Sequence, residues 1–187
     1  KAGTTGFGGE VTAGLLTDLN ARAGINFLNF DIDQDIDDVE YNLGLDFSSI
    51  SGLVDWHVFD DSFHLTGGVY SLNHEISLDA RPTESVDIGD GTYTVSGGGT
   101  IKGAVEFDGL SPYLGIGWGN PIQSNRNWGF TLDLGVIFTD SPDVSLSATG
   151  LAAGLAADIE IERKKIEDDL DALRFYPVVT MGLFFRF

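Results

Sequence analysis

Apolar residues recur at every second position at the C-terminal end of the chain. Val179, Met181, Leu183, Phe185 and Phe187 carry apolar side chains, and the positions between them hold charge, glycine and aromatics. A period of two places alternate side chains on opposite faces of a β-strand. The pattern therefore predicts a closing strand with one wholly apolar face.

The same alternation recurs along the rest of the chain. In all, seven runs show it: residues 5–15, 19–27, 39–58, 63–70, 101–118, 130–138 and 176–187. Most are longer than the ~5–6 residues usual for strands of soluble proteins. Two runs change phase internally, near Ser48 and Ser49 and again before Leu114. An extra residue shifts an alternation by one position, so the sequence predicts a β-bulge at 48–49.

The connections between the runs are of two kinds. Short connections are predicted at 16–18, 59–62 and 119–127, and acidic ones at 31–38, 79–99 and 141–171. Short turns on one rim and long loops on the other are typical of outer-membrane barrels. Trp56, Trp118 and Trp128 all lie beside short turns. Because indole prefers the membrane–water interface, these three are predicted to form an interfacial aromatic girdle.

The predicted fold class is all-β: a transmembrane antiparallel up-and-down β-barrel of about eight strands, forming a single domain over residues 1–187. The alternative is a soluble sandwich in which the apolar faces form the core. Strand length, loop asymmetry and the terminal aromatic residue together favour the barrel. The segment 151–173 repeats apolar residues at helical spacing, which predicts an amphipathic helix in the loop before the last strand. A helix resting on the barrel mouth is the simpler interpretation, and a plug or a partner-binding element is the other.

The strand count leaves one strand to be found, because seven runs are seen where eight are expected. Either a strand lies upstream of Lys1, or a run counted as single contains a hairpin. The segment 79–103 could supply the hairpin, since its stretch VDIGDGTYTV holds an Asp-Gly turn between alternating residues.

Composition excludes several classes of function. The 187 residues include 29 acidic and 10 basic side chains, for a formal net charge of −19, and no cysteine. Such acidity argues against nucleic-acid binding, which needs a basic face, and against adhesion to an anionic lipid surface. The lack of cysteine excludes disulfides and thiolate metal sites. No apolar stretch approaches the ~18 residues of a membrane helix. The first residues do not resemble a signal peptide, so if the protein is exported we expect Lys1 to begin a processed or trimmed chain.

Charged residues fall on the polar phase of the predicted strands, where they would line a barrel lumen. We expect them to form a lumen ion-pair network of Glu10, Glu40, Asp46, Asp55, Glu106 and Asp133 with Arg22, Lys102, Arg174 and Arg186. Ions enclosed with little water need partners to offset lost solvation. Glycines on the same phase would open space for a pore: Gly8, Gly14, Gly24, Gly44, Gly68, Gly135 and Gly182.

Two other patterns give weaker indications of a functional site. The stretch DIDQDIDDVEYN starts like a calcium loop, but Ile36 and Asn42 stand where an EF-hand needs glycine and glutamate. A solvated acidic loop is the main interpretation, and weak divalent-cation binding at 31–40 is the alternative. His57, His64 and His74 have neither metal-ligand spacing nor a serine arranged for acyl chemistry. The sequence thus predicts no enzyme, no cofactor and no metal.

Three stretches resemble a known family. They are GTTGFGG at 3–9, SPYLGIGWGNP at 111–121 with the strand that follows it at 127–150, and the closing segment 168–187. All three are similar to small outer-membrane barrels of the OmpW and CarO kind. The resemblance implies an eight-stranded barrel in the outer membrane of a Gram-negative bacterium, in contact with its lipids and lipopolysaccharide. It also implies that Phe187 is the assembly signal read by the barrel-assembly machinery.

Two functions follow from the resemblance and the composition. The first is a narrow passive channel for small polar solutes such as amino acids. The second is a non-conducting structural or surface-interaction barrel with acidic external loops. A barrel of about eight strands is just wide enough to be filled by its own side chains, so the lumen decides between them.

Overall fold

The computed structural model of the chain describes residues 1–36, 39–58, 62–81, 85–88, 91–123, 127–151, 156–170 and 174–186. Its elements are β1 Ala2–Gly3, β2 Gly6–Gly14, β3 Leu19–Ile36, β4 Val39–Trp56, β5 Phe63–Arg81, β6 Ser85–Ile88, β7 Gly91–Trp118, β8 Trp128–Phe138, β9 Asp143–Leu151, α1 Ala156–Leu170 and β10 Phe175–Phe185. No helix among the described residues has both the length and the apolar character needed to cross a membrane.

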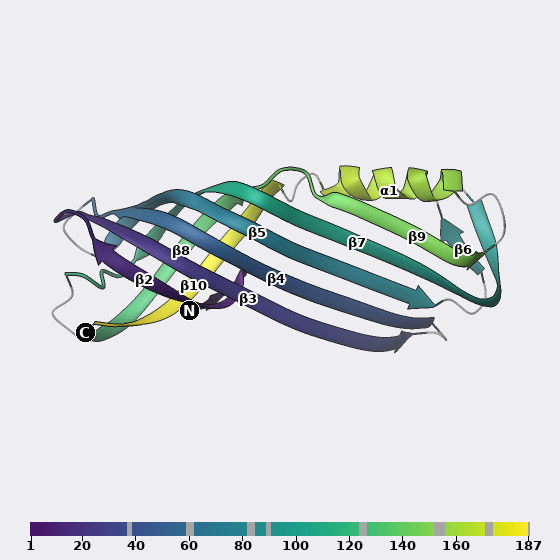
Figure 1. Cartoon of the computed structure of the whole chain (residues 1–187), viewed down its shortest axis with the longest axis horizontal. Helices are drawn as coiled ribbons and strands as arrows, with labels where there is room; N and C mark the ends of the chain where they lie inside the picture. The colour runs from purple at the N-terminus through teal and green to yellow at the C-terminus, as the bar shows by residue number, and fades with distance from the viewer. Residues whose placement is uncertain are drawn as a thin grey trace.

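Eight of the described strands close into an antiparallel barrel (Figure 1). Around the ring the order is β1, β2, β3, β4, β5, β7, β8 and β10, and β10 pairs with β1 again. Closure leaves no free edge within the barrel, so every strand there is paired on both sides over part of its length. The predicted all-β barrel with one helix is confirmed.

The eighth strand is β1, which precedes the first predicted run at 5–15 and forms a hairpin with β2. Ala2 pairs with Phe7 and Gly3 with Gly6 around a Thr4-Thr5 turn. Gly6 has a φ of 99°, and a Cβ there would lie 2.5 Å from the carbonyl oxygen of Phe27. A glycine is therefore required at this turn. The proposed hairpin at 79–103 also exists, but β6 pairs with β7 alone and is not a barrel strand.

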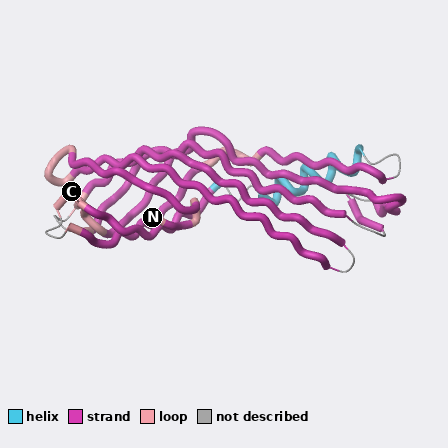
Figure 2. The backbone as a smooth tube through the Cα atoms, turned by 60° about the horizontal axis from the view of Figure 1, so that its bottom comes forward, coloured by secondary structure: helices cyan, strands magenta, loops and turns pink. Residues whose placement is uncertain are grey.

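Four barrel strands continue well beyond the ring. β2 follows β3 only as far as Phe27, and β8 accompanies β7 only from Tyr113 onward. Past these points β9 takes the place of β8 beside β7. We call the open part the extended sheet: residues 28–36, 39–47, 74–81 and 95–107 of β3, β4, β5 and β7, together with β9. Figure 2 shows it projecting from the end of the barrel opposite the C-terminus.

The predicted bulge at 48–49 is wrong. β4 and β5 keep a single register from Glu40↔Arg81 to Trp56↔Leu65, with no residue inserted. What changes is the polarity of the two faces. The outward side passes from Ile50 to Asp46, while the inward side passes from Ser49 to Phe47.

The same exchange of polarity explains the phase change before Leu114. Leu114 and Leu110 are exposed on the outward side of β7, and Phe107 is buried on the inward side, again in one unbroken register with β5. In the barrel the outward side is apolar; in the extended sheet the outward side is polar and the inward side apolar. One strand thus crosses two environments, and the exchange mimics a one-residue slip.

The acidic connections are shorter than predicted. β3 reaches Ile36 and β4 begins at Val39, so the acidic segment 31–40 is largely a β-hairpin. The connection predicted at 141–171 contains β9 as well as the helix. α1 lies beside β9 and β6 (Figure 1) and carries its own ion pairs. Arg163 hydrogen-bonds to Glu160, which lowers the pKa of that exposed carboxyl to about 2.

Candidate functional site in the barrel lumen

Arg22 is the centre of a charge cluster that spans the lumen. It projects inward from β3, and its guanidinium reaches acids on three other strands. Nε lies 2.7 Å from Asp55 Oδ2 on β4, Nη2 lies 3.0 Å from Asp133 Oδ1 on β8, and Nη1 lies 3.3 Å from Glu10 Oε1 on β2. The cluster therefore ties opposite walls of the barrel together.

Further side chains complete the cluster. Lys1 Nζ lies 2.6 Å from Glu10 Oε2, Thr66 Oγ1 donates to Asp55 Oδ1 at 2.8 Å, and His64 Nε2 lies 3.3 Å from Asp133 Oδ1. His57 stacks on His64 with ring centroids 5.0 Å apart. Arg22 and Asp133 are only 7% and 6% exposed. Ions so enclosed are tolerated because each carboxylate has a cationic or hydrogen-bonding partner.

An apolar layer lies next to the charge cluster. It consists of Leu53, Tyr70, Leu72, Tyr113, Ile137 and Val178, all buried. The rings of Tyr70 and Tyr113 meet edge to face with centroids 5.4 Å apart. The space that Arg22 and Asp133 line together with these tyrosines does not admit a water molecule. The lumen is closed at this level.

The inward glycines do not open a pore. At six of the seven predicted positions an added Cβ would come within 3.1 Å of another heavy atom inside the barrel, whereas Gly44 lies on the outward side of the extended sheet, beside Ser77 and Asp31. The Tyr113 ring lies over Gly135, and Leu53 and the β4 backbone lie against Gly68. Small residues here make room for large neighbours, so the expectation of open space is wrong.

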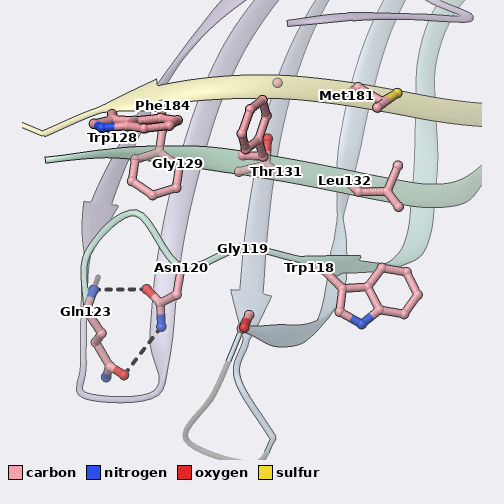
Figure 3. Close-up of a pocket in the computed structure, with 13 residues that line it drawn as sticks. Trp118, Gly119, Asn120, Gln123, Trp128, Gly129, Thr131, Leu132, Met181 and Phe184 are labelled. Carbon is pink, nitrogen blue, oxygen red and sulfur yellow. Dashed lines mark hydrogen bonds between the residues drawn. The ribbon is translucent and has the colours of Figure 1, made fainter. Parts of the chain in front are cut away.

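Residues of the segment 119–123, which follows β7, line a cavity together with Trp128 and Thr131 of β8 and Phe184 of β10 (Figure 3). Asn120 Oδ1 accepts hydrogen bonds from the backbone N–H groups of Ile122 and Gln123, at 3.2 and 3.1 Å. Ile122 lies against Gly14, and its carbonyl accepts from Arg186 Nη1 at 3.1 Å. The cavity has a volume of about 650 Å³ and is lined mainly by aromatic and apolar side chains.

The structure gathers four of the ten predicted network residues: Glu10, Arg22, Asp55 and Asp133. Sequence reasoning missed Lys1, Thr66 and Tyr113 as parts of the closed lumen. Tyr113 lies on the inward phase of its strand, and that phase was the available signal.

The lumen placement is wrong for five other residues. Asp46, Lys102 and Glu106 lie on the outward side of the extended sheet, where Lys102 is 63% exposed and pairs with Asp79 at 3.1 Å. The exchange of polarity beyond the barrel moves them outside. Arg174 is exposed and donates to Ser141 Oγ, and Arg186 is exposed at the mouth. The side chain of Glu40, and Phe187 as a whole, lie outside the described residues.

The three tryptophans lie on the outer surface at the short-turn end. Trp56, Trp118 and Trp128 are exposed, and Trp56 Nε1 donates to Asp18 Oδ2 at 3.2 Å. Their contact with a membrane interface remains a prediction. Within the described ranges, no group of three or more His, Asp or Glu side chains is placed to hold a metal ion, and the side chains of residues 34–40 lie outside those ranges.

Comparison with known proteins identifies solved structures that share this fold. No family model matches the chain, and no curated protein does. A crystal structure of CarO from Acinetobacter baumannii aligns with a TM-score of 0.70, over 100% of this chain and 94% of that one. The chain has the fold of CarO. Sequence identity to CarO is 22%, and CarO2 of the same organism aligns with a TM-score of 0.70 at 20% identity, over 100% of this chain and 95% of that one. The predicted OmpW- and CarO-like barrel is thus confirmed as a fold.

Proposed function

We propose that the chain is an integral barrel of the outer membrane of a Gram-negative bacterium. Large apolar side chains on the outward side of the barrel support this, among them Val11, Phe130, Met181 and Phe185, which is 73% exposed. The lumen is already filled, so this apolar belt has no place in a core and suits lipid instead. Lipopolysaccharide and the barrel-assembly machinery are the partners that belong to this proposal.

We propose further that the barrel is a closed passage for small zwitterions such as amino acids. The observation that carries this is the Arg22 cluster, in which one guanidinium bridges three carboxylates across the lumen. A zwitterion brings an ammonium that can bind a carboxylate of the cluster and a carboxylate that can bind Arg22. It can therefore exchange with existing ion pairs without leaving a buried charge unpaired. A simple ion or an uncharged sugar cannot do so.

A second candidate is a non-conducting barrel that acts at the cell surface. The absence of room for water between Arg22 and Tyr113 favours it, because passage then requires side chains to move. The two candidates differ in whether such movement happens at a useful rate.

Liposome swelling and planar-bilayer conductance test the proposal. We expect wild-type protein to admit glycine into liposomes but to show little steady ion conductance. Arg22→Ala should raise ion conductance several-fold, because it removes the bridge and leaves a hydrated acidic gap. Arg163→Ala on α1 is the control, since it removes an arginine that pairs with two carboxylates but lies outside the lumen.

Folding must be checked, because an unpaired buried carboxylate costs about 3–5 kcal/mol. Tyr113→Ala provides a second variant that loosens the lumen without unpairing a charge. Wild-type vesicles that exclude glycine and two variants that stay non-conducting would rule out the passage and leave the surface role.

A further inference from the structure

We propose that the free edge of β3 in the extended sheet binds an extended segment of another protein, one whose side chains alternate between basic and apolar. The free edge comprises residues 28–36. This interaction surface is separate from the lumen and does not depend on whether the barrel conducts.

Among the described strands, none pairs with the outer side of β3 beyond Phe27. β2 pairs with β3 only up to Phe27, whereas β4 pairs with the other side of β3 from Leu28↔Phe47 to Ile36↔Val39. No other described strand pairs with β3. Figure 1 shows β3 as the outermost strand of the projecting sheet. Its outer N–H and C=O groups are therefore available for a further strand.

Two of the usual protections against strand addition, proline and β-bulges, are missing from this edge, and so is lysine. Residues 28–36 contain no lysine and no proline, and their register with β4 is unbroken. Natural edges are commonly shielded by such residues or by bulges. The charges present are acidic and occur at alternate positions, so the edge repels some strands and attracts others.

The two faces of the edge define the partner. Asn29, Asp31 and Asp33 are exposed on the outward side, and Asp46 lies beside Asn29 on β4. Leu28, Phe30 and Ile32 lie on the inward side, where they continue the apolar face of β4 and Phe30 is 54% exposed. An added strand with lysine or arginine outward and apolar residues inward would pair with the acids and cover the apolar face.

A second copy of the chain does not meet these requirements. Two β3 edges paired antiparallel about a two-fold axis would bring the acids of one copy against those of the other. Like charges directly opposite in a sheet are destabilising. The net charge of −19 adds to this repulsion.

Binding of two capped nine-residue peptides to the detergent-solubilised full chain tests the proposal. One peptide alternates lysine with valine and the other alternates glutamate with valine. We expect the lysine peptide to bind at least ten-fold more tightly in fluorescence anisotropy. In the Asp31→Lys/Asp33→Lys variant the preference should reverse.

Glu75→Lys/Glu106→Lys is the matched control, because it makes the same change of charge at exposed positions of β5 and β7, which are paired with a strand on each side. It should retain the wild-type preference. Amide hydrogen exchange should show new protection within residues 28–36 when the lysine peptide binds. The proposal would be overturned if both peptides bound equally, or if the two double variants lost the preference for the lysine peptide to the same extent. Protection from exchange that is confined to strands other than β3 would also overturn it. Self-association through β3, seen in sedimentation, would overturn it in favour of a second copy.

Discussion

At the residue scale, the lumen is closed by large side chains seated on small ones. The Tyr113 hydroxyl would lie 2.4 Å from a Cβ at either Gly115 or Gly135, so two glycines on neighbouring strands hold one aromatic ring. Arg22 occupies the adjacent level with its carboxylates. Each filled position removes space that a pore would need.

Gly135→Ala should therefore destabilise the barrel by about 1–3 kcal/mol, because the new methyl group overlaps the Tyr113 ring. Equilibrium unfolding in urea with lipid vesicles measures the change. In a Tyr113→Ala background the same substitution should cost much less. A cost independent of residue 113 would show that the ring does not occupy the position described.

Leu134→Arg tests the outward apolar belt. Leu134 is exposed on β8, two positions from Val136 and opposite Val179 of β10. An arginine near the middle of a bilayer costs ~2–4 kcal/mol. Ser147→Arg, on the outward side of β9 in the extended sheet, is the control and should cost little. If both variants changed the free energy of unfolding in vesicles by the same small amount, the result would contradict a lipid-facing belt.

At the scale of elements, strands β3, β4, β5 and β7 each serve two structures. Their barrel halves face lipid in the proposed function, and their outer halves form an open sheet with its own apolar face. A row of acids crosses the outward side of that sheet just beyond the barrel. Adjacent strands pair Asp46 with Glu75, Glu75 with Glu106, and Glu106 with Asp143. Such a row is a source of strain, since like charges sit opposite each other.

Glu75→Gln should stabilise the extended sheet by about 0.2–1 kcal/mol, because it removes the charge flanked by Asp46 and Glu106. Amide hydrogen exchange of residues 74–81 measures this local stability. Asp143→Asn, at the end of the row with one acidic neighbour in it, should give a smaller gain. Added salt should reduce both gains, because these exposed charges are screened. Faster exchange in Glu75→Gln would contradict the repulsive row.

At the scale of the whole molecule, the apolar belt and the acidic extended sheet divide the chain into two ends. The short turns and the tryptophans lie at one end, and the extended sheet with α1 lies at the other. In an outer membrane the short turns face the periplasm. The extended sheet would then stand outside the cell.

Two measurements check this arrangement. The protein should require detergent to stay dispersed, and protease added to intact Gram-negative cells should cut within the extended sheet but leave the barrel strands whole. The physical reason is that lipid and closed pairing protect the barrel backbone. A protein that is monodisperse without detergent would contradict the membrane assignment.

The sequence by itself determined the barrel. Period-two alternation, long runs and the asymmetry of the connections are local properties, so they survive without knowledge of partners. They placed Glu10, Arg22, Asp55 and Asp133 on the inward side, and put the tryptophans at the short-turn end. The helix within 151–173 followed from its 3.6-residue spacing.

The tertiary structure decided what the alternation could not. Polarity tells the two faces of a strand apart but does not tell which face is inside, because that depends on whether lipid or water lies outside at that height. For this reason Asp46, Lys102 and Glu106 were placed in the lumen when they lie outside it, and an exchange of polarity was taken for a bulge. Three features depend on which strands end first. They are the closure of the barrel by β1, the filling of the space beside the inward glycines by the Tyr113 side chain, and the open edge of β3. Which strands end first depends on pairing between distant segments, which no local pattern records.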